Sequence, residues 1–217
     1  MSQAQDVEKQ LRTMILDMAL APGERITERW AESQLGASRT SVRAALMRLE
    51  SEGLIMREGR GWMVTPIHLK EVEQLFDYRE VLEVAAVRMA AVRADIDDLD
   101  ALQALLDDCG PGTPRELAHQ LGADFHVQLA RLSGNEFIGR AVADAMNRLA
   151  RARWLDARAD HHGWDEHRSL LAALRRRDAD QAAALISAHV HEGRDRLLTA
   201  LQSDRRSLRA RGVRLVE

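Results

Sequence analysis

Apolar residues recur every three or four positions along most of this 217-residue chain, which is the spacing of amphipathic α-helices. Three such stretches follow one another near the N-terminus. Their apolar positions are Val7, Leu11, Ile15 and Met18; then Trp30, Ala31 and Leu35; then Val42, Ala45, Leu46 and Leu49. Ala21-Pro22-Gly23 ends the first stretch, and Thr27 and Ser38 stand where N-caps of the next two helices are expected.

The pattern changes after Gly53. Two short apolar runs, 54–56 and 62–65, are joined by Arg57-Glu58-Gly59-Arg60-Gly61, which predicts a hairpin with a basic, glycine-bearing tip. Three helices and a hairpin in this order predict a winged helix-turn-helix, in which the third helix enters a DNA major groove and the hairpin lies along the backbone.

Beyond Pro66 every segment has a helical pattern. The fold class is therefore mainly α, with residues 1–66 as a winged helix-turn-helix domain and 67–203 as an all-helical bundle. We expect the arginine-rich tail, 204–217, to be disordered. The predicted helices of the bundle span residues 68–94, 97–108, 114–132, 135–159, 164–177 and 179–202.

Composition places the chain among globular proteins of a reducing compartment. Hydrophobic residues make up 46% and charged residues 30% of the chain, and the single cysteine, Cys109, excludes an internal disulfide. No apolar run approaches the roughly 20 residues that span a bilayer, and the N-terminus lacks the order of a secretory signal. We expect a cytoplasmic protein that has no membrane partner.

Net charge does not by itself indicate a nucleic-acid partner, because it is −3. The arrangement of charges does, since Ser38 to Leu49 contains three arginines and no acid. Arg39 and Arg43 are one helical turn apart and can each bridge guanine O6 and N7 or hold a phosphate. Thr40 and Ser41 are short enough to let the helix end approach DNA closely. The alternative interpretation is that the arginines are ordinary solvated side chains.

The pattern PGERIT…LGASRTSVRAALMRLESEGL…RGWMV resembles the DNA-binding domain of the GntR family of bacterial transcription regulators. The second part of the chain resembles the FCD effector domain of that family, a bundle of helices. Its motifs are Tyr78-Arg79-Glu80-Val81-Leu82-Glu83, Asp124-Phe125-His126, Leu132-Ser133-Gly134-Asn135, Glu166-His167, Arg177-Asp178 and Ala188-His189. This resemblance implies that residues 67–203 bind an effector and dimerise. In the first part, the resemblance implies operator contacts from Arg29, Ser38, Arg39, Thr40, Ser41, Arg43, Arg60 and Gly61.

Three histidines, His126, His167 and His189, fall on or beside apolar stripes of three different helices. One such histidine is usually a core residue bonded to a carbonyl, but three from one bundle can converge and bind Zn²⁺ or Ni²⁺. Metal-binding FCD domains use these histidines together with a carboxylate four residues before the first, where this chain has Gly122. Asp124 does not replace that carboxylate, because two residues along a helix turn through about 200°. A three-histidine metal site and a metal-free pocket for a larger effector both stay open.

Arg79 falls inside the apolar seam of its helix, where a charge needs a partner. Glu83, one turn later, is a permanent candidate, and an incoming carboxylate is the other. The resemblance favours the carboxylate, because many FCD regulators sense small organic acids. The predicted effector site therefore comprises Arg79, Glu83 and the three histidines.

These features predict a non-enzymatic, ligand-responsive transcription regulator that binds a palindromic operator as a homodimer. The resemblance implies a repressor, because repression relieved by an effector is the commoner mode in the family. Two other functions compete with it. A three-histidine metal with an open position could serve a hydrolase, although no carboxylate sits beside the histidines at a spacing suited to a general base. An architectural protein that coats DNA without a signal is the other, but such a protein needs strong positive charge.

Overall fold

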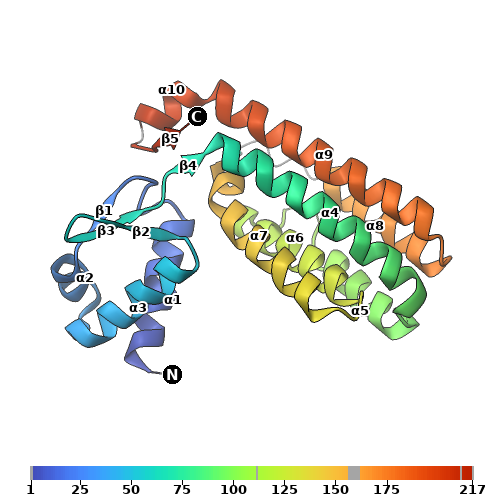
Figure 1. Cartoon of the computed structure of the whole chain (residues 1–217), viewed down its shortest axis with the longest axis horizontal. Helices are drawn as coiled ribbons and strands as arrows, with labels where there is room; N and C mark the ends of the chain where they lie inside the picture. The colour runs from blue at the N-terminus through green and yellow to red at the C-terminus, as the bar shows by residue number, and fades with distance from the viewer. Residues whose placement is uncertain (1, 111, 156–161, 211, 217) are drawn as a thin grey trace. The chain divides into compact units, whose positions relative to one another are not determined.

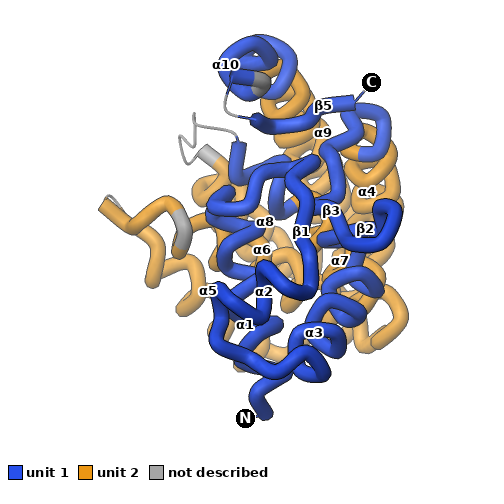
Figure 2. Tube along the Cα trace, turned by 90° about the vertical axis from the view of Figure 1, so that its left-hand side faces the viewer, with its two compact units in different colours: residues 1–71, 150–155, 201–217 blue, residues 72–149, 156–200 orange. Residues whose placement is uncertain are grey.

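The computed structural model describes residues 2–110, 112–155, 162–210 and 212–216. They form two compact units: unit 1 contains residues 1–71, 150–155 and 201–217, and unit 2 contains 72–149 and 156–200 (Figure 2). Figure 1 labels the helices and strands along the chain. In the part that the structure describes, no helix is both long and apolar enough to cross a membrane.

Unit 1 begins with the three predicted helices, α1 (Gln3–Leu16), α2 (Glu28–Leu35) and α3 (Arg39–Ser51). Both predicted caps are confirmed, because Thr27 accepts a hydrogen bond from Trp30 N–H and Ser38 accepts one from Ser41 N–H. Helix α1 ends earlier than its apolar stripe suggested: Met18 lies beyond it with a φ of 59°. Buried residues of all three helices share one core with Leu20, Ile26 and Trp62.

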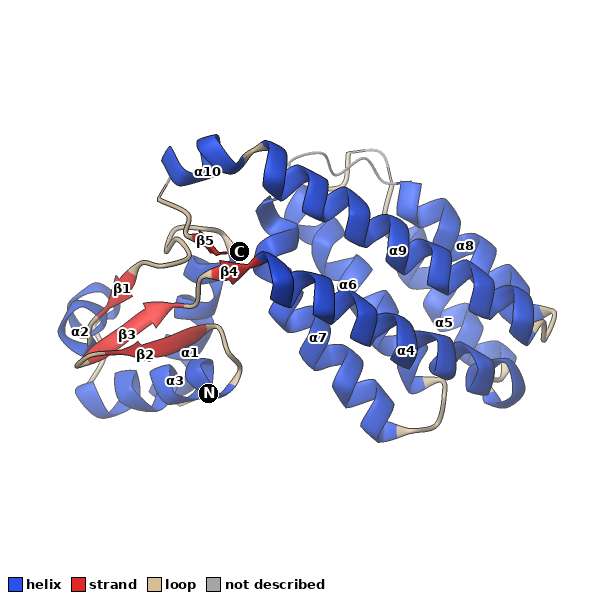
Figure 3. Ribbon diagram, turned by 45° about the horizontal axis from the view of Figure 1, so that its top comes forward, coloured by secondary structure: helices blue, strands red, loops and turns tan. Residues whose placement is uncertain are grey.

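The predicted wing is the hairpin of β2 (Ile55–Glu58) and β3 (Gly61–Val64). Its two-residue tip is Gly59-Arg60, and Gly59 adopts a φ of 59°, which glycine reaches without a steric cost. A third strand, β1 (Arg25–Ile26), was not predicted; it pairs antiparallel with β3, so that the sheet order is β1-β3-β2 (Figure 3).

The C-terminal tail has regular structure where the sequence predicted disorder. It contains α10 (Arg205–Ala210) and β5 (Leu215–Val216), and β5 pairs in parallel with β4 (Ile67–His68). The prediction weighed the arginines of the tail and overlooked its apolar residues: Leu208, Val213 and Leu215 are buried. Prediction of helix alone beyond Pro66 was therefore wrong at both of these strands.

Backbone hydrogen bonds tie this tail to the rest of unit 1. Arg214 N–H donates to Pro22 O at 2.9 Å, and Arg214 O accepts from Ile67 N–H at 3.1 Å. A Cβ added to Gly23 would lie 2.7 Å from Cβ of Arg214, so a glycine is needed at this close approach. The last turn of α7 also belongs to unit 1, where Arg151 donates to the carbonyl of Thr65.

Unit 2 is helical, as predicted. Its elements are α4 (Leu69–Arg93), α5 (Ile96–Asp107), α6 (Arg115–Arg131), α7 (Glu136–Leu155), α8 (His162–Arg175) and α9 (Ala179–Ser203), the ends of α4, α7 and α9 extending into unit 1. One apolar cluster joins Ala86 of α4, Ala130 of α6 and Val142 of α7. The predicted helix 135–159 ends at 155 in the structure, and residues 156–159 lie outside the described part.

Candidate functional site

Helix α3 presents its arginines to solvent because its opposite face is buried. Val42, Ala45, Leu46 and Leu49 have no exposed surface, whereas the side chains of Arg39 and Arg43 are 71% and 55% exposed. Thr40 is exposed on the same first turn, and Met47, which was not predicted, is exposed one turn beyond Arg43. The spacing of Met47 from Arg43 could have identified it, since residues four apart share a helix face.

The two predicted serines, Ser38 and Ser41, make hydrogen bonds at the start of α3. Ser38 caps α3, and the Ser41 hydroxyl lies 3.0 Å from the Ser38 hydroxyl and donates to Gln3 Oε1 at 2.8 Å. Ser41 is only half exposed, so its hydroxyl is occupied in linking α3 to α1. Both serines thus fix the orientation of the helix end that carries Arg39.

Both exposed arginines contact Glu28, which was not predicted as a site residue. Glu28, the first residue of α2, accepts from Arg39 Nε and from Arg43 Nε, each at 2.8 Å, and from Arg43 Nη2 at 3.2 Å. The hydrogen bonds from Arg43 and then Arg39 lower the pKa of the Glu28 carboxyl, so it is ionised at neutral pH. No local signal marked it, because 11 and 15 residues separate Glu28 from its partners.

Arg29 and Arg60 differ from the other arginines around α3 in their side-chain contacts. Arg29 is exposed on the first turn of α2, Arg60 is exposed at the wing tip, and neither makes a hydrogen bond or ion pair within the described ranges. Arg57 instead lies over the Trp62 ring at 3.7 Å, and Arg25 bonds to Glu58. Gly61 has a packing role, because a Cβ there would lie 3.0 Å from Ile26 O.

The three predicted histidines meet inside unit 2. His126 of α6, His167 of α8 and His189 of α9 each offer a ring nitrogen, and these three atoms lie within 4.8 Å of one another. The Nε2 atom of His189 is 3.2 Å from that of His126 and 3.2 Å from that of His167. His126 and His167 are buried, and the Phe125 ring stacks on that of His167 with centroids 4.1 Å apart.

Carboxylates hold the other side of two of these rings. Glu83 of α4 contacts His126 Nδ1 at 2.6 Å, and Glu166 of α8 contacts His189 Nδ1. Burial would raise the pKa of Glu83, but the charge of Arg79, together with hydrogen bonds from His126 and Arg79, lowers it to about 2. Burial lowers the pKa of His126 to about 3, although Glu83 opposes this effect. A neutral His126 must donate from Nδ1 to the carboxylate, which leaves a lone pair on Nε2.

This arrangement suits a metal ion. If His189 likewise donates from Nδ1 to Glu166, two Nε2 lone pairs face each other across 3.2 Å, which a shared cation would relieve. Ligand nitrogens around tetrahedral zinc stand about 3.3 Å apart, close to the 3.2 Å between His189 Nε2 and the Nε2 atom of each of the other two histidines. Among the described residues the group holds only these histidines, so it has no carboxylate ligand.

Arg79 has a permanent partner, Glu83, which is one of the two partners that the sequence predicted. Its Nε donates to Glu83 Oε1 at 2.8 Å, and both side chains are almost completely buried. Its Nη2 is also buried, yet it has no hydrogen-bond partner in the part of the chain that the structure describes. Both oxygens of Glu83 are engaged, one with Arg79 and the other with His126.

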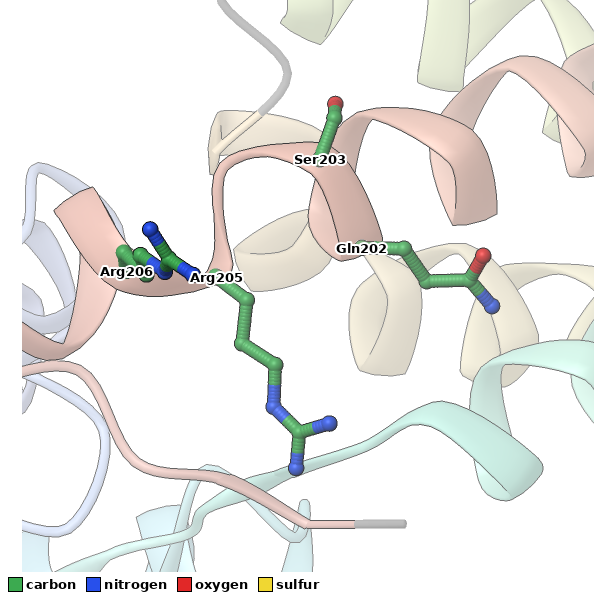
Figure 4. A pocket seen from close by; sticks show the side chains of 4 residues that line it. All are labelled: Gln202, Ser203, Arg205 and Arg206. Atoms are coloured by element: carbon green, nitrogen blue, oxygen red, sulfur yellow. The ribbon is translucent and has the colours of Figure 1, made fainter.

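A separate hollow lies where α9 ends and α10 begins (Figure 4). Gln202, Ser203, Arg205 and Arg206 line it, all of them in unit 1. None of these residues was predicted as a site residue, and the histidines belong to unit 2.

Comparison with known proteins gives matches over both parts of the chain. Residues 3–64 match the model described as bacterial regulatory proteins of the gntR family, and residues 74–192 match the FCD domain. The chain is 31% identical over 193 residues to the Nta operon transcriptional regulator of Aminobacter aminovorans, covering 87% of this chain and 91% of the relative. It is 27% identical to the HTH-type transcriptional regulator YdhC of Bacillus subtilis, covering 89% of this chain and 90% of that one.

Among solved structures, E. coli McbR/YncC has a similar fold. Its TM-score is 0.77, with 22% sequence identity over 92% of this chain and 98% of that one.

Proposed function

This chain belongs to the GntR family of bacterial regulatory proteins and carries an FCD domain; from that premise we propose that it is a repressor controlled by a small organic acid. It is a DNA-binding transcription regulator with a C-terminal effector domain, as its family and relatives establish. The operator contacts, the sign of regulation and the effector are the proposal. A cytoplasmic location and a non-enzymatic role, in line with the names of its relatives, belong to it as well.

The observation that carries the DNA-binding proposal is the division of α3 into a buried apolar face and an exposed face with Arg39, Thr40 and Arg43. Arginine pairs with guanine through two donors, so each of these arginines can identify a base pair in a major groove. Arg29 and Arg60 are assigned to phosphates, since both guanidiniums are exposed and available. One such helix contacts few base pairs, so we propose a homodimer on a palindromic operator.

The effector site is assigned to the buried cluster of unit 2. A small carboxylate would supply the missing partner of Arg79 Nη2, because a buried guanidinium with an unsatisfied N–H favours an anion. Glu83 then acts as a fixed support of both Arg79 and His126, since one of its oxygens contacts Arg79 and the other contacts His126.

His126, His167 and His189 would hold a divalent metal, Zn²⁺ or Ni²⁺, through their Nε2 atoms. When bound, the metal would offer open coordination positions to the oxygens of the acid. Glu83 and Glu166 would fix the orientation of two rings by accepting from their Nδ1 atoms. Contacts with Nδ1 atoms give both carboxylates an orienting role rather than that of the general base that a hydrolase needs, which disfavours the enzymatic alternative.

The test uses a duplex that the wild-type protein selects from a random-sequence pool. We expect Arg43→Ala to weaken binding to this duplex roughly ten- to a hundredfold, because one base-reading guanidinium is lost. Arg48→Ala is the matched control: it removes the same charge from the same helix, but Arg48 bonds to Glu8 of α1. Equal effects of the two substitutions, or failure to select any sequence, would contradict the assigned reading face.

A further inference from the structure

Glu28 holds both of the arginines that α3 presents. Its Oε2 atom accepts from Arg39 Nε, and its two oxygens accept from the Nε and Nη2 of Arg43. The Glu28 side chain is 14% exposed, against 71% for Arg39 and 55% for Arg43. The carboxylate is therefore the sheltered partner, and the guanidiniums are the groups that solvent, or a ligand, can reach.

The contacts with Glu28 decide which donors remain available. Arg39 uses only its Nε, so both of its terminal nitrogens are without a bond to any residue that the structure describes. Arg43 uses the edge formed by Nε and Nη2, which leaves Nη1 and the second hydrogen of Nη2. Each guanidinium thus keeps two parallel donors at its end, and guanine presents the matching pair of acceptors, O6 and N7.

We propose that Glu28 is a positioning residue for sequence specificity, which orients Arg39 and Arg43 so that they meet guanine end-on. This inference rests on the proposed role of α3 in reading DNA. A guanidinium held in place loses less conformational freedom when it binds a base than one that must first be ordered. A released guanidinium can instead reach any nearby phosphate, which supplies affinity without sequence information.

Charge acts in the same direction. The two arginines and Glu28 together carry one net positive charge, so the carboxylate halves the charge that the pair offers to phosphates. The pKa of Glu28 lies below its usual range because of the hydrogen bonds from Arg43 and Arg39, and the negative charge is therefore present at neutral pH. Glu28 should weaken binding to any DNA and strengthen the preference for the correct one.

The competing explanation is that Glu28 only stabilises α2. An acid in the first turn of a helix interacts favourably with the helix dipole, and Glu28 follows the N-cap Thr27. On that account, its removal would lower the melting temperature and leave the discrimination between DNA sequences unchanged.

The experiment compares two dissociation constants at one fixed salt concentration. One is for the duplex selected from random sequence by the wild-type protein, and the other is for a mixed-sequence duplex of the same length. Glu28→Gln removes the charge and weakens the contacts. Glu28→Asp keeps the charge but is one methylene shorter, so it cannot reach both arginines as Glu28 does. Glu32→Gln is the matched control. Glu32 lies on the same helix, but its oxygen is 4.0 Å from Arg39 Nε, which is too far for a hydrogen bond.

We expect Glu28→Gln and Glu28→Asp each to reduce the ratio of the dissociation constant for the mixed-sequence duplex to that for the selected duplex by about tenfold or more. This factor is the discrimination that one bidentate contact provides. Glu28→Gln should also tighten binding to the mixed-sequence duplex, while Glu32→Gln should leave the ratio within about twofold. Melting temperatures show whether each variant is folded. An unchanged ratio in the two folded Glu28 variants, or an equal reduction in Glu32→Gln, would overturn the inference.

The outcome with Arg43→Ala separates this inference from the function on which it rests. If Arg43→Ala leaves the ratio unchanged, the reading role of α3 is wrong, and the inference fails with it. If Arg43→Ala reduces the ratio but the Glu28 variants do not, α3 reads DNA without help from Glu28.

Discussion

The same pair of groups, an arginine and a glutamate joined by a hydrogen bond of 2.8 Å, occurs in two opposite environments in this chain. On the DNA-binding domain, Glu28 holds Arg39 and Arg43 at the surface. In the helical bundle, Glu83 holds Arg79 where both side chains are almost completely buried. Equal bond lengths therefore say little about what each pair contributes.

The two ion pairs differ in whether water can solvate their charges when the partners separate. An exposed pair adds little to folding stability, because water solvates both ions when they separate, so it can orient its arginines without being needed for the fold. In a buried pair, loss of one partner leaves an uncompensated charge in the interior. The surface pair suits a role in orienting arginines for a ligand, and the buried pair suits a fixed support inside the bundle.

Substitution of the two glutamates tests this comparison most strongly. We expect Glu83→Gln to lower the free energy of unfolding by about 3–5 kcal/mol, since Arg79 would lose its charged partner in the interior. Glu28→Gln should change the free energy of unfolding little, because surface ion pairs contribute little. Urea unfolding followed by circular dichroism measures both. Similar losses in the two variants would remove the distinction between the sites.

Metal binding by the three histidines should give the next largest change in stability. We expect Zn²⁺ or Ni²⁺ at 100 times its dissociation constant to stabilise the wild-type protein by about 2.7 kcal/mol, and a chelator to reverse this shift. The variant with His126, His167 and His189 all replaced by alanine should show no shift. His191→Ala is the matched control, since His191 is two residues beyond His189 but contacts Glu80.

A metal shift that persists in the triple variant would place the metal elsewhere. A wild-type protein with no shift would favour the metal-free pocket that Gly122 allows.

Much of unit 1 could be predicted because its information is local. The apolar face of α3 and the caps Thr27 and Ser38 follow from spacing and from residue type, and the structure has each of them. Strand β1 has two residues, too few for an alternating pattern to be seen. The tail was predicted wrongly, because Val213 and Leu215 form too short an apolar pattern to compete with the surrounding arginines.

The sites show the same limit. Helical spacing placed the three histidines on inward stripes, and the structure brings them together. Spacing also paired Arg79 with Glu83, because these residues are one turn apart. It did not reveal that Glu28 would reach across to α3, or that Glu83 would contact His126 as well as Arg79. Contacts between helices depend on packing, which one sequence does not state.

We propose that an acid bound beside Arg79 in the FCD domain controls DNA binding by the arginines of α3. The most direct test measures the affinity for the selected duplex with and without the acid that stabilises the wild-type protein most in a panel of mono-, di- and tricarboxylic acids. We expect this acid to change the affinity of the wild-type protein roughly five- to 150-fold, the usual range of coupling between two sites. Arg79→Lys keeps a positive charge beside Glu83 but lacks the Nη2 donor, so it should bind the duplex as the acid-free wild type does and should not respond to the acid. An equal response in the wild type and in folded Arg79→Lys would contradict this proposal.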